Sequence, residues 1–155
     1  EGAKVFITDI NQDTLKTISA KYNAEVVSLD GIYDVDMDIY APCALGATLN
    51  TENIARLKCG VVSGAANNQL ADEFVHGPML ESKGILYAPD FLINAGGLIN
   101  VYSELHGYDR KVAIQHTEAI YETTLEVFRK ATTEKISTIE AAKKIAEERI
   151  AGSRQ

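Results

Sequence analysis

The chain has 155 residues, of which 46% are hydrophobic and 24% are charged, and this composition is typical of one globular domain with a sizeable core. Its 22 acidic and 15 basic residues give a net charge of −7, which argues against nucleic acid or an anionic membrane surface as a partner. The sequence contains no apolar run near the ~18 residues of a membrane span and no signal-peptide pattern, so we expect no membrane association.

The cysteines and histidines do not have the spacing of a metal site. Cys43 and Cys59 form neither a metal-type motif nor a disulfide framework, and the three histidines are scattered along the chain. We therefore expect no bound metal and a reducing, cytoplasmic location.

The first predicted strand is the β-type run 4–8, which stops at Asp9. A helix capped by Asn11 is predicted to follow it. In a dinucleotide-binding fold, the acidic residue that ends the second strand accepts hydrogen bonds from the adenosine ribose, about 20 residues beyond a glycine-rich phosphate loop. Asp9 matches this acidic position, although no such loop precedes it in the chain. On the residues alone, the alternative is that Asp9 only starts a turn.

Two further predicted strands end in small residues. The runs 37–41 and 60–63 are predicted to be buried strands, with a short helix capped by Thr51 between them. Because ligands of an open parallel sheet bind where the strands end, small residues there suit a loop that a flat ring approaches closely. An asparagine carries a donor and an acceptor for a ribose hydroxyl or a carboxamide, although asparagines also make turns. The residues in question are Pro42, Cys43, Ala44, Ala65, Ala66 and Asn67.

The segment that follows contains an unusual glycine pair. A polar helix is predicted over 69–83, a buried strand over 85–88, and then a helix with Asp90 as its N-cap. Gly96 and Gly97 stand inside this last predicted helix, where each costs roughly 1 kcal/mol relative to alanine. Two explanations fit: close approach of a cofactor to the backbone, and tight packing against a neighbouring helix.

The order of these elements predicts an α/β fold. Residues 1–108 are expected to form a Rossmann-type doubly wound parallel sheet, and residues 109–155 two C-terminal helices, capped by Asp109 and by a capping box that begins at Ser137. If the run 4–8 is the second strand of such a sheet, the first strand and its glycine loop are missing, and the sheet is incomplete at its N-terminus.

Three motifs follow one another along the chain: PCALG at 42–46, GAANNQL at 64–70 and APDFLINAGGLINV at 88–101. Together they resemble the glutamate/leucine/phenylalanine/valine dehydrogenase family, and within it the leucine dehydrogenases most closely. The resemblance implies an NAD-binding domain of an enzyme that reversibly deaminates an L-amino acid. In that reaction NAD accepts a hydride from the α-carbon, and a 2-oxo acid and ammonia result.

The resemblance also implies which residues form the site. Asn94 is expected to hold the nicotinamide carboxamide, because two amides pair naturally. Leu98 and Val101 match positions that line the pocket for the substrate side chain, and their apolar nature disfavours glutamate. The implied cofactor residues are Asp9 at the adenosine ribose, Pro42, Cys43 and Ala44 beside the adenosine half, Ala65, Ala66 and Asn67 at the nicotinamide ribose, and Asn94, Gly96 and Gly97 at the nicotinamide.

In the family, two lysines and an aspartate of an N-terminal domain carry the acid–base chemistry, so no catalytic residue is expected in this chain. We expect the chain alone to be inactive, the full-length enzyme to be a homo-oligomer, and the C-terminal helices to reach towards the absent catalytic domain. Two alternatives remain: an enzyme of the same family that acts on phenylalanine, valine or glutamate, and a non-catalytic dinucleotide-binding domain. A nucleophilic Cys43 is a weaker idea, because no histidine is near it in the sequence.

Overall fold

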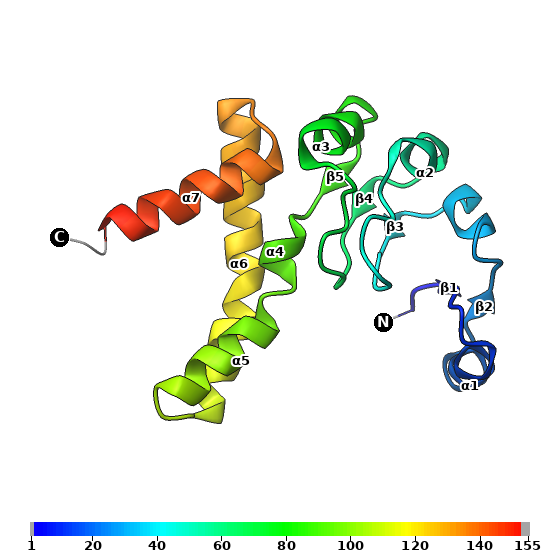
Figure 1. Ribbon diagram of the computed structural model, residues 1–155, viewed down its shortest axis with the longest axis horizontal. Helices are drawn as coiled ribbons and strands as arrows, with labels where there is room; N and C mark the ends of the chain where they lie inside the picture. Colours follow the sequence, from blue (N-terminus) through cyan, green and yellow to red (C-terminus); the bar gives the residue numbers. More distant parts are fainter. Residues whose placement is uncertain (1, 153–155) are drawn as a thin grey trace.

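The computed structural model describes residues 2–152, and its strands form two small parallel sheets. In the first sheet, β1 (Phe6–Ile7) pairs with β2 (Glu25–Val26). In the second, β4 (Val61–Val62) lies between β3 (Ile39–Tyr40) and β5 (Leu86–Tyr87). Figure 1 shows the two sheets as separate groups, and β1 and β3 do not pair within residues 2–152. The parallel strands with helices between and after them confirm the predicted α/β class.

Short helices connect the strands. They are α1 (Gln12–Tyr22), the 3₁₀ turn η1 (Gly31–Asp34), α2 (Thr51–Arg56) and α3 (Glu73–Ser82). The Asn11 side chain accepts hydrogen bonds from backbone N–H groups in the first turn of α1, which confirms the predicted cap.

Two predicted helix starts are wrong. Asn50, not Thr51, is the N-cap of α2, and its Oδ1 accepts a hydrogen bond from Asn53 N at 2.9 Å. The predicted helix 69–83 begins only after Asp72, whose carboxylate caps α3. Residues 69–71 instead run past the ends of the strands, where Leu49 and Leu70 form an isolated parallel bridge.

The segment after β5 also differs from the prediction of one continuous helix. α4 (Asp90–Ile93) and α5 (Gly96–Leu105) are separate, with residues 94–95 between them. Pro89 occupies the N-cap position of α4, so Asp90 is the first helical residue and not the cap.

Two long helices complete the chain, α6 (Arg110–Glu134) and α7 (Thr138–Gly152). The predicted cap at Asp109 is confirmed, because its carboxylate accepts from Lys111 N at 2.8 Å. Of the predicted capping box at Ser137, the bond from Glu140 N to Ser137 Oγ is present at 3.1 Å, while the Glu140 carboxylate pairs with Lys144. α6 packs against α4, α5 and α7, and Figure 1 shows it running beside the edge of the three-stranded sheet.

The main hydrophobic core lies around the three-stranded sheet. Its side chains come from β3 to β5, from α2 and α3, and from the start of α7. Lys143 of α7 also pairs with Glu73 of α3, so the last helix is tied to the same unit. No helix within residues 2–152 is long and apolar enough to cross a membrane. The completely buried members of this core are Leu49, Ile54, Val62 and Leu80.

Candidate functional site

The loops that follow β3 and β4 are joined to each other at the carboxyl ends of the strands. Ala66 N donates to Pro42 O at 3.0 Å, and Ala65 N lies 3.5 Å from Cys43 Sγ. Gly64 allows this contact, because a Cβ atom at that position would overlap the backbone of Pro42. In Figure 1 both loops project from the same side of the sheet. The structure therefore brings together the small residues that the sequence analysis singled out after these two strands.

The segment after β5 reaches the same place through Asn94. Its Nδ2 donates to Asn67 Oδ1 at 2.5 Å and approaches Ala66 O at 3.4 Å. Asn94 is half-buried and Asn67 is exposed, so the bonded amide pair lies at the surface where all three strands end. This bond joins residues 27 positions apart in the chain, and it lies where α4 ends.

Gln69 is a residue of this site that sequence reasoning missed. The sequence predicts a polar helix that begins at this residue, yet the Gln69 side chain is completely buried. Gln69 Nε2 donates to Gly64 O at 2.6 Å and to Ala66 O at 2.9 Å. Its backbone N–H donates to Asp90 Oδ2 at 2.9 Å, and its carbonyl accepts from Leu49 N at 3.0 Å. Gln69 thus contacts the segments that follow all three strands.

One atom of Gln69 has no hydrogen bond. Its Oε1 is buried without a partner among the described residues, and such an acceptor costs about 1–3 kcal/mol. Turning the amide over would not help, because Oε1 would then face the two carbonyl oxygens that Nε2 now contacts. The two bonds to Gly64 and Ala66 therefore fix the orientation of the amide.

The glycine pair stands at the start of α5 and not inside a longer helix, which corrects the sequence prediction. A Cβ atom on Gly97 would meet nothing within 4 Å, and one on Gly96 would only make an ordinary contact of 3.5 Å with Thr117 Cγ2. Packing against α6 therefore does not require either glycine. No packing contact within residues 2–152 therefore accounts for the glycine at position 97.

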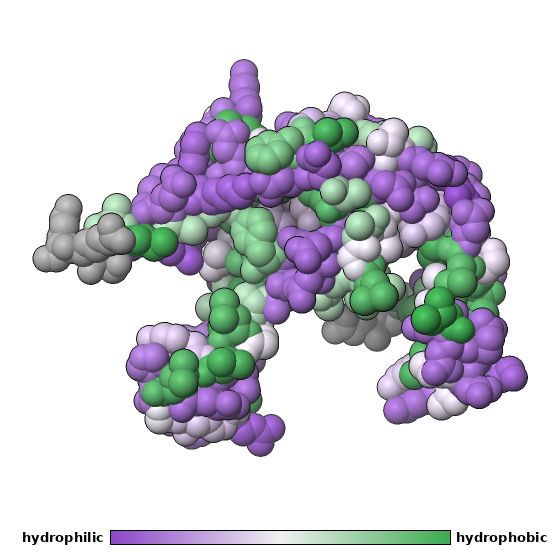
Figure 2. All heavy atoms as spheres, in the orientation of Figure 1, coloured by the Kyte–Doolittle hydropathy of each residue, from purple (hydrophilic) through white to green (hydrophobic). Residues whose placement is uncertain are grey.

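Leu98 and Val101 are both on α5 and both face solvent. Leu98 is 73% exposed and Val101 is 54% exposed, so neither belongs to a hydrophobic core of the described chain. They stand three residues apart, which puts them on one side of the helix. Figure 2 shows hydrophobic spheres on α5 at this outer end of the molecule.

Asp9 lies apart from the other predicted residues. It follows β1, in the two-stranded sheet, and its exposed carboxylate accepts a hydrogen bond from Asn11 N at 2.8 Å. Figures 1 and 2 show an arch in which α1 and β1 form one arm, α5 forms the other, and the β3 and β4 loops project between them. A ligand that contacts Asp9 and Asn94 together would have to be extended across this concave side.

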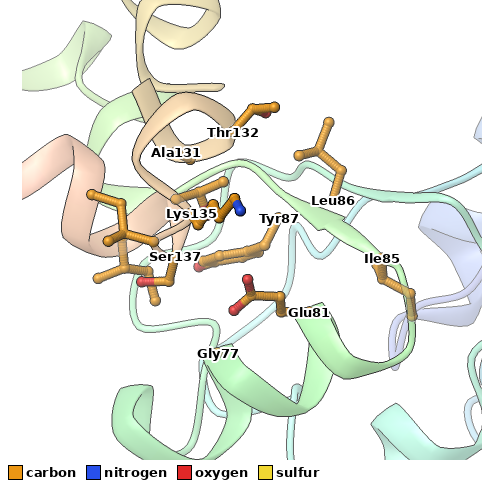
Figure 3. A pocket seen from close by; sticks show the side chains of 12 residues that line it. Gly77, Glu81, Ile85, Leu86, Tyr87, Ala131, Thr132, Lys135 and Ser137 are labelled. Atoms are coloured by element: carbon orange, nitrogen blue, oxygen red, sulfur yellow. The ribbon is translucent and has the colours of Figure 1, made fainter. Parts of the chain in front are cut away.

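A cavity of about 340 Å³ lies elsewhere, between α3, the start of β5 and the turn from α6 to α7. Figure 3 shows Tyr87, Glu81 and Lys135 at its wall. Burial raises the pKa of the Tyr87 phenol above its usual range. None of the cofactor or substrate residues that the sequence analysis singled out lines this cavity. Residues 2–152 also contain no cluster of three or more side chains suited to a metal ion.

The sequence is similar to that of known amino-acid dehydrogenases. Residues 3–155 match the model of the family "Glutamate/Leucine/Phenylalanine/Valine dehydrogenase". A leucine dehydrogenase from Thermoactinomyces intermedius is 55% identical over 150 residues, which cover 97% of this chain and 41% of that protein. A phenylalanine dehydrogenase from Caldalkalibacillus thermarum is 43% identical over 155 residues, 97% of this chain and 42% of that protein. The chain thus spans about two fifths of the length of these relatives.

The structure has a close counterpart as well. It superposes on the crystal structure of L-tryptophan dehydrogenase from Nostoc punctiforme with a TM-score of 0.95 and 44% identity, over 97% of this chain and 46% of that one. A hetero-hexameric glutamate dehydrogenase from Thermus thermophilus matches with a TM-score of 0.65 and 18% identity, over 88% of this chain and 35% of that one, which shows a shared fold. With strand ends, fold and sequence in agreement, the chain belongs to the glutamate/leucine/phenylalanine/valine dehydrogenase family.

Proposed function

We propose that this chain is the NAD-binding part of an enzyme that deaminates L-leucine and other branched-chain amino acids to 2-oxo acids and ammonia. The observation that carries this proposal is the bonded pair Asn67 and Asn94 where β4 and β5 end. NAD, when bound, supplies the group that accepts the hydride. The chain binds and orients that group.

The amide pair fits a nicotinamide carboxamide because one acceptor and one donor of the pair stay unbonded within the described chain. The bond between the two side chains uses Asn94 Nδ2 and Asn67 Oδ1. Asn94 Oδ1 and Asn67 Nδ2 remain, one acceptor and one donor, and neither has a hydrogen-bond partner among residues 2–152. A primary carboxamide has the complementary donor and acceptor, and a ribose hydroxyl also pairs with Asn67 Nδ2.

Gly96 and Gly97 support a nicotinamide ring at the start of α5. Beside Gly97 no atom of residues 2–152 fills the position of a side chain. A flat ring held by Asn94 finds room there, close to the backbone. Leu98 and Val101 follow within the next turn, so a substrate side chain that packs on them keeps its α-carbon near the ring.

The apolar side chains of α5 favour branched aliphatic substrates. A substrate methylene buried against Leu98 or Val101 gains roughly 0.8 kcal/mol, while a glutamate carboxylate would lose water without a charged partner. The relatives are named for leucine, tryptophan and phenylalanine, so an aromatic substrate is the second candidate.

Further parts of the proposal concern the whole protein. Asp9 accepts hydrogen bonds from the adenosine ribose, with Pro42, Cys43 and Ala44 beside the adenosine half, which favours NAD over its 2′-phosphorylated form. Residues 1–108 form the cofactor part and residues 109–155 the helices that face a catalytic domain. In the full-length protein, a further parallel strand lies between β1 and β3 and joins the two sheets into one. We also propose a homo-oligomer in the cytoplasm.

Coenzyme reduction by the purified full-length protein tests the proposal. We expect NAD to be reduced to NADH with L-leucine, L-isoleucine and L-valine, and only slowly with L-glutamate. When NADP replaces NAD, we expect hardly any reduction to NADPH. If the rate with L-phenylalanine equals or exceeds the rates with the branched-chain amino acids, an aromatic amino acid is the substrate instead. If no amino acid reduces either coenzyme, and NADH does not bind, the chain is not part of such an enzyme.

A further inference from the structure

We infer that Gln69 and Asp90 are positioning residues that hold the β4 loop against the segment after β5, so that Asn67 and Asn94 form a preassembled seat for nicotinamide. This inference rests on the proposed function. Neither residue is expected to contact the coenzyme through its side chain, since Gln69 is completely buried and the Asp90 carboxylate already accepts two backbone N–H groups.

The Gln69 side chain determines the shape of the β4 loop. Its Nε2 bonds to Gly64 O and to Ala66 O, which lie on either side of Ala65. Ala66 O is also the carbonyl that Asn94 Nδ2 approaches at 3.4 Å. A change in the position of this carbonyl would therefore move one partner of the Asn94 amide.

Asp90 links the same loop to the next strand. One carboxylate oxygen accepts from Gln69 N at 2.9 Å and the other from Phe91 N at 2.7 Å. Asp90 O accepts from Asn94 N at 3.0 Å, so this residue bonds to the backbone of both Gln69 and Asn94. The side chain of Asn94 then closes the ring of contacts on Asn67.

The bonds also hold the loop where apolar packing is scarce. Ala65 and Asn67 are exposed, and small side chains offer little hydrophobic area to fix a loop. Hydrogen bonds that the buried Gln69 amide donates and the Asp90 carboxylate accepts replace that packing. Preorganisation of this kind increases affinity by lowering the ordering cost of binding, and here it acts on the nicotinamide half of the coenzyme.

The test uses the full-length protein with Gln69→Met, which keeps the length of the side chain and removes its donor. Gln115→Met is the matched control, because Gln115 is exposed on α6. Affinities for NADH and for ADP are measured by fluorescence titration. ADP carries the adenine half without nicotinamide, so a defect confined to the nicotinamide seat leaves its binding unchanged.

We expect Gln69→Met to weaken NADH binding by about 10-fold or more, ADP binding by less than about 2-fold, and the control to change neither. The conservative variant Asp90→Asn keeps an acceptor for Gln69 N and is expected to lose less NADH affinity than Asp90→Ala. The double variant Gln69→Met with Asp90→Ala should lose less than the sum of the two single losses, because the residues act on one loop.

Parallel loss of NADH and ADP binding in Gln69→Met would overturn the inference, since it would indicate general damage to the fold. Unchanged NADH binding in both Gln69→Met and Asp90→Ala would overturn it as well. If Gln69→Met does not fold, the two Asp90 variants provide the test. NADH affinity should then be lower in Asp90→Ala than in Asp90→Asn, without a matching loss of ADP affinity, and any other order would overturn the inference. Failure of the unaltered protein to bind NADH is a different result, because it contradicts the proposed function and not only the roles of Gln69 and Asp90.

Discussion

The two parallel sheets differ in how firmly they hold their strand ends. In the three-stranded sheet, the loops are bonded to one another through Gln69 and Asn94, above a core that includes Leu49 and Ile54 at 0% exposure. In the two-stranded sheet with α1, Leu15 and Ala24 are the buried hydrophobic residues among 2–27. The nicotinamide half of the proposed site is thus built into a packed unit, and the adenosine half at Asp9 lies on a lightly packed one.

This difference suggests a division of tasks between the two units. A hydride has to be delivered at near contact distance, so small shifts of the nicotinamide reduce the rate strongly. In the proposed function the adenosine ribose only has to be bound, and we expect an exposed carboxylate at the end of a short strand to be sufficient for that. The predictions below compare the two units, beginning with the largest expected effect.

The difference in packing is tested with Ile54→Ala and Val26→Ala. Ile54 is completely buried in α2, so its truncation should lower the free energy of unfolding by about 2–5 kcal/mol. Val26 is 48% exposed in β2, and the same truncation there should cost less than about 1 kcal/mol. Chemical denaturation of the full-length protein measures both. Equal losses would show that the two sheets are packed alike.

The glycines allow a comparison within the three-stranded unit. Gly64→Ala forces a Cβ into the backbone of Pro42, so we expect both thermal stability and NADH affinity to fall, the latter by about 100-fold. The new Cβ in Gly97→Ala meets no atom of the described residues, and we expect an unchanged or slightly raised melting temperature with about 10-fold weaker NADH binding. Calorimetry and fluorescence titration separate the two effects. If Gly97→Ala left NADH affinity unchanged, no ligand would approach the backbone there.

On the adenosine side, Asp9→Ser should alter coenzyme choice. The carboxylate repels a 2′-phosphate, and without it the preference for NAD over NADP should fall by about 10-fold or more, mainly through weaker use of NAD. The exposed position predicts little change in the melting temperature. The ratio of kcat/KM for the two coenzymes is the measurement. If the ratio equals that of the unaltered protein, Asp9 does not bind the coenzyme and only starts a turn, through its hydrogen bond with Asn11 N.

The smallest expected effect concerns the substrate pocket. Val101→Ala removes apolar contact from a side chain that is 54% exposed in this chain. We expect kcat/KM for L-valine to fall more than for L-phenylalanine, by about 10-fold. This is the low end of the roughly 1–3 kcal/mol that a methylene contributes in a closed pocket, because Val101 is half exposed. Steady-state kinetics with both amino acids show the difference. Equal losses with the two amino acids would show that Val101 does not line the substrate pocket.

Local features of the structure could be predicted from the sequence, because their causes are local. The side chains of Asn11 and Asp109 cap helices by accepting from backbone N–H groups two or three residues away. A capping residue just before a helical pattern is enough to predict such bonds. β3 and β4 were predicted in the same way, from apolar runs that end in small residues, although both strands are shorter than the predicted runs 37–41 and 60–63.

The features that could not be predicted depend on distant partners. Helical spacing continues from Asp90 to Leu105, yet the helix breaks at residues 94–95, where the Asn94 side chain bonds to Asn67. Gln69 looks like a surface residue by polarity, and only its bonds to Gly64, Ala66 and Asp90 show why it is buried. Hydrophobic patterning does not indicate buried polar side chains of this kind.

The most direct test of the account is a structure of the full-length protein with NAD bound. We expect the nicotinamide carboxamide within hydrogen-bond distance of Asn94, the nicotinamide ring over Gly97, and the adenosine ribose at the Asp9 carboxylate. A coenzyme that lies away from the ends of β3, β4 and β5, for example against the cavity beside Tyr87, would contradict the assignment of the site.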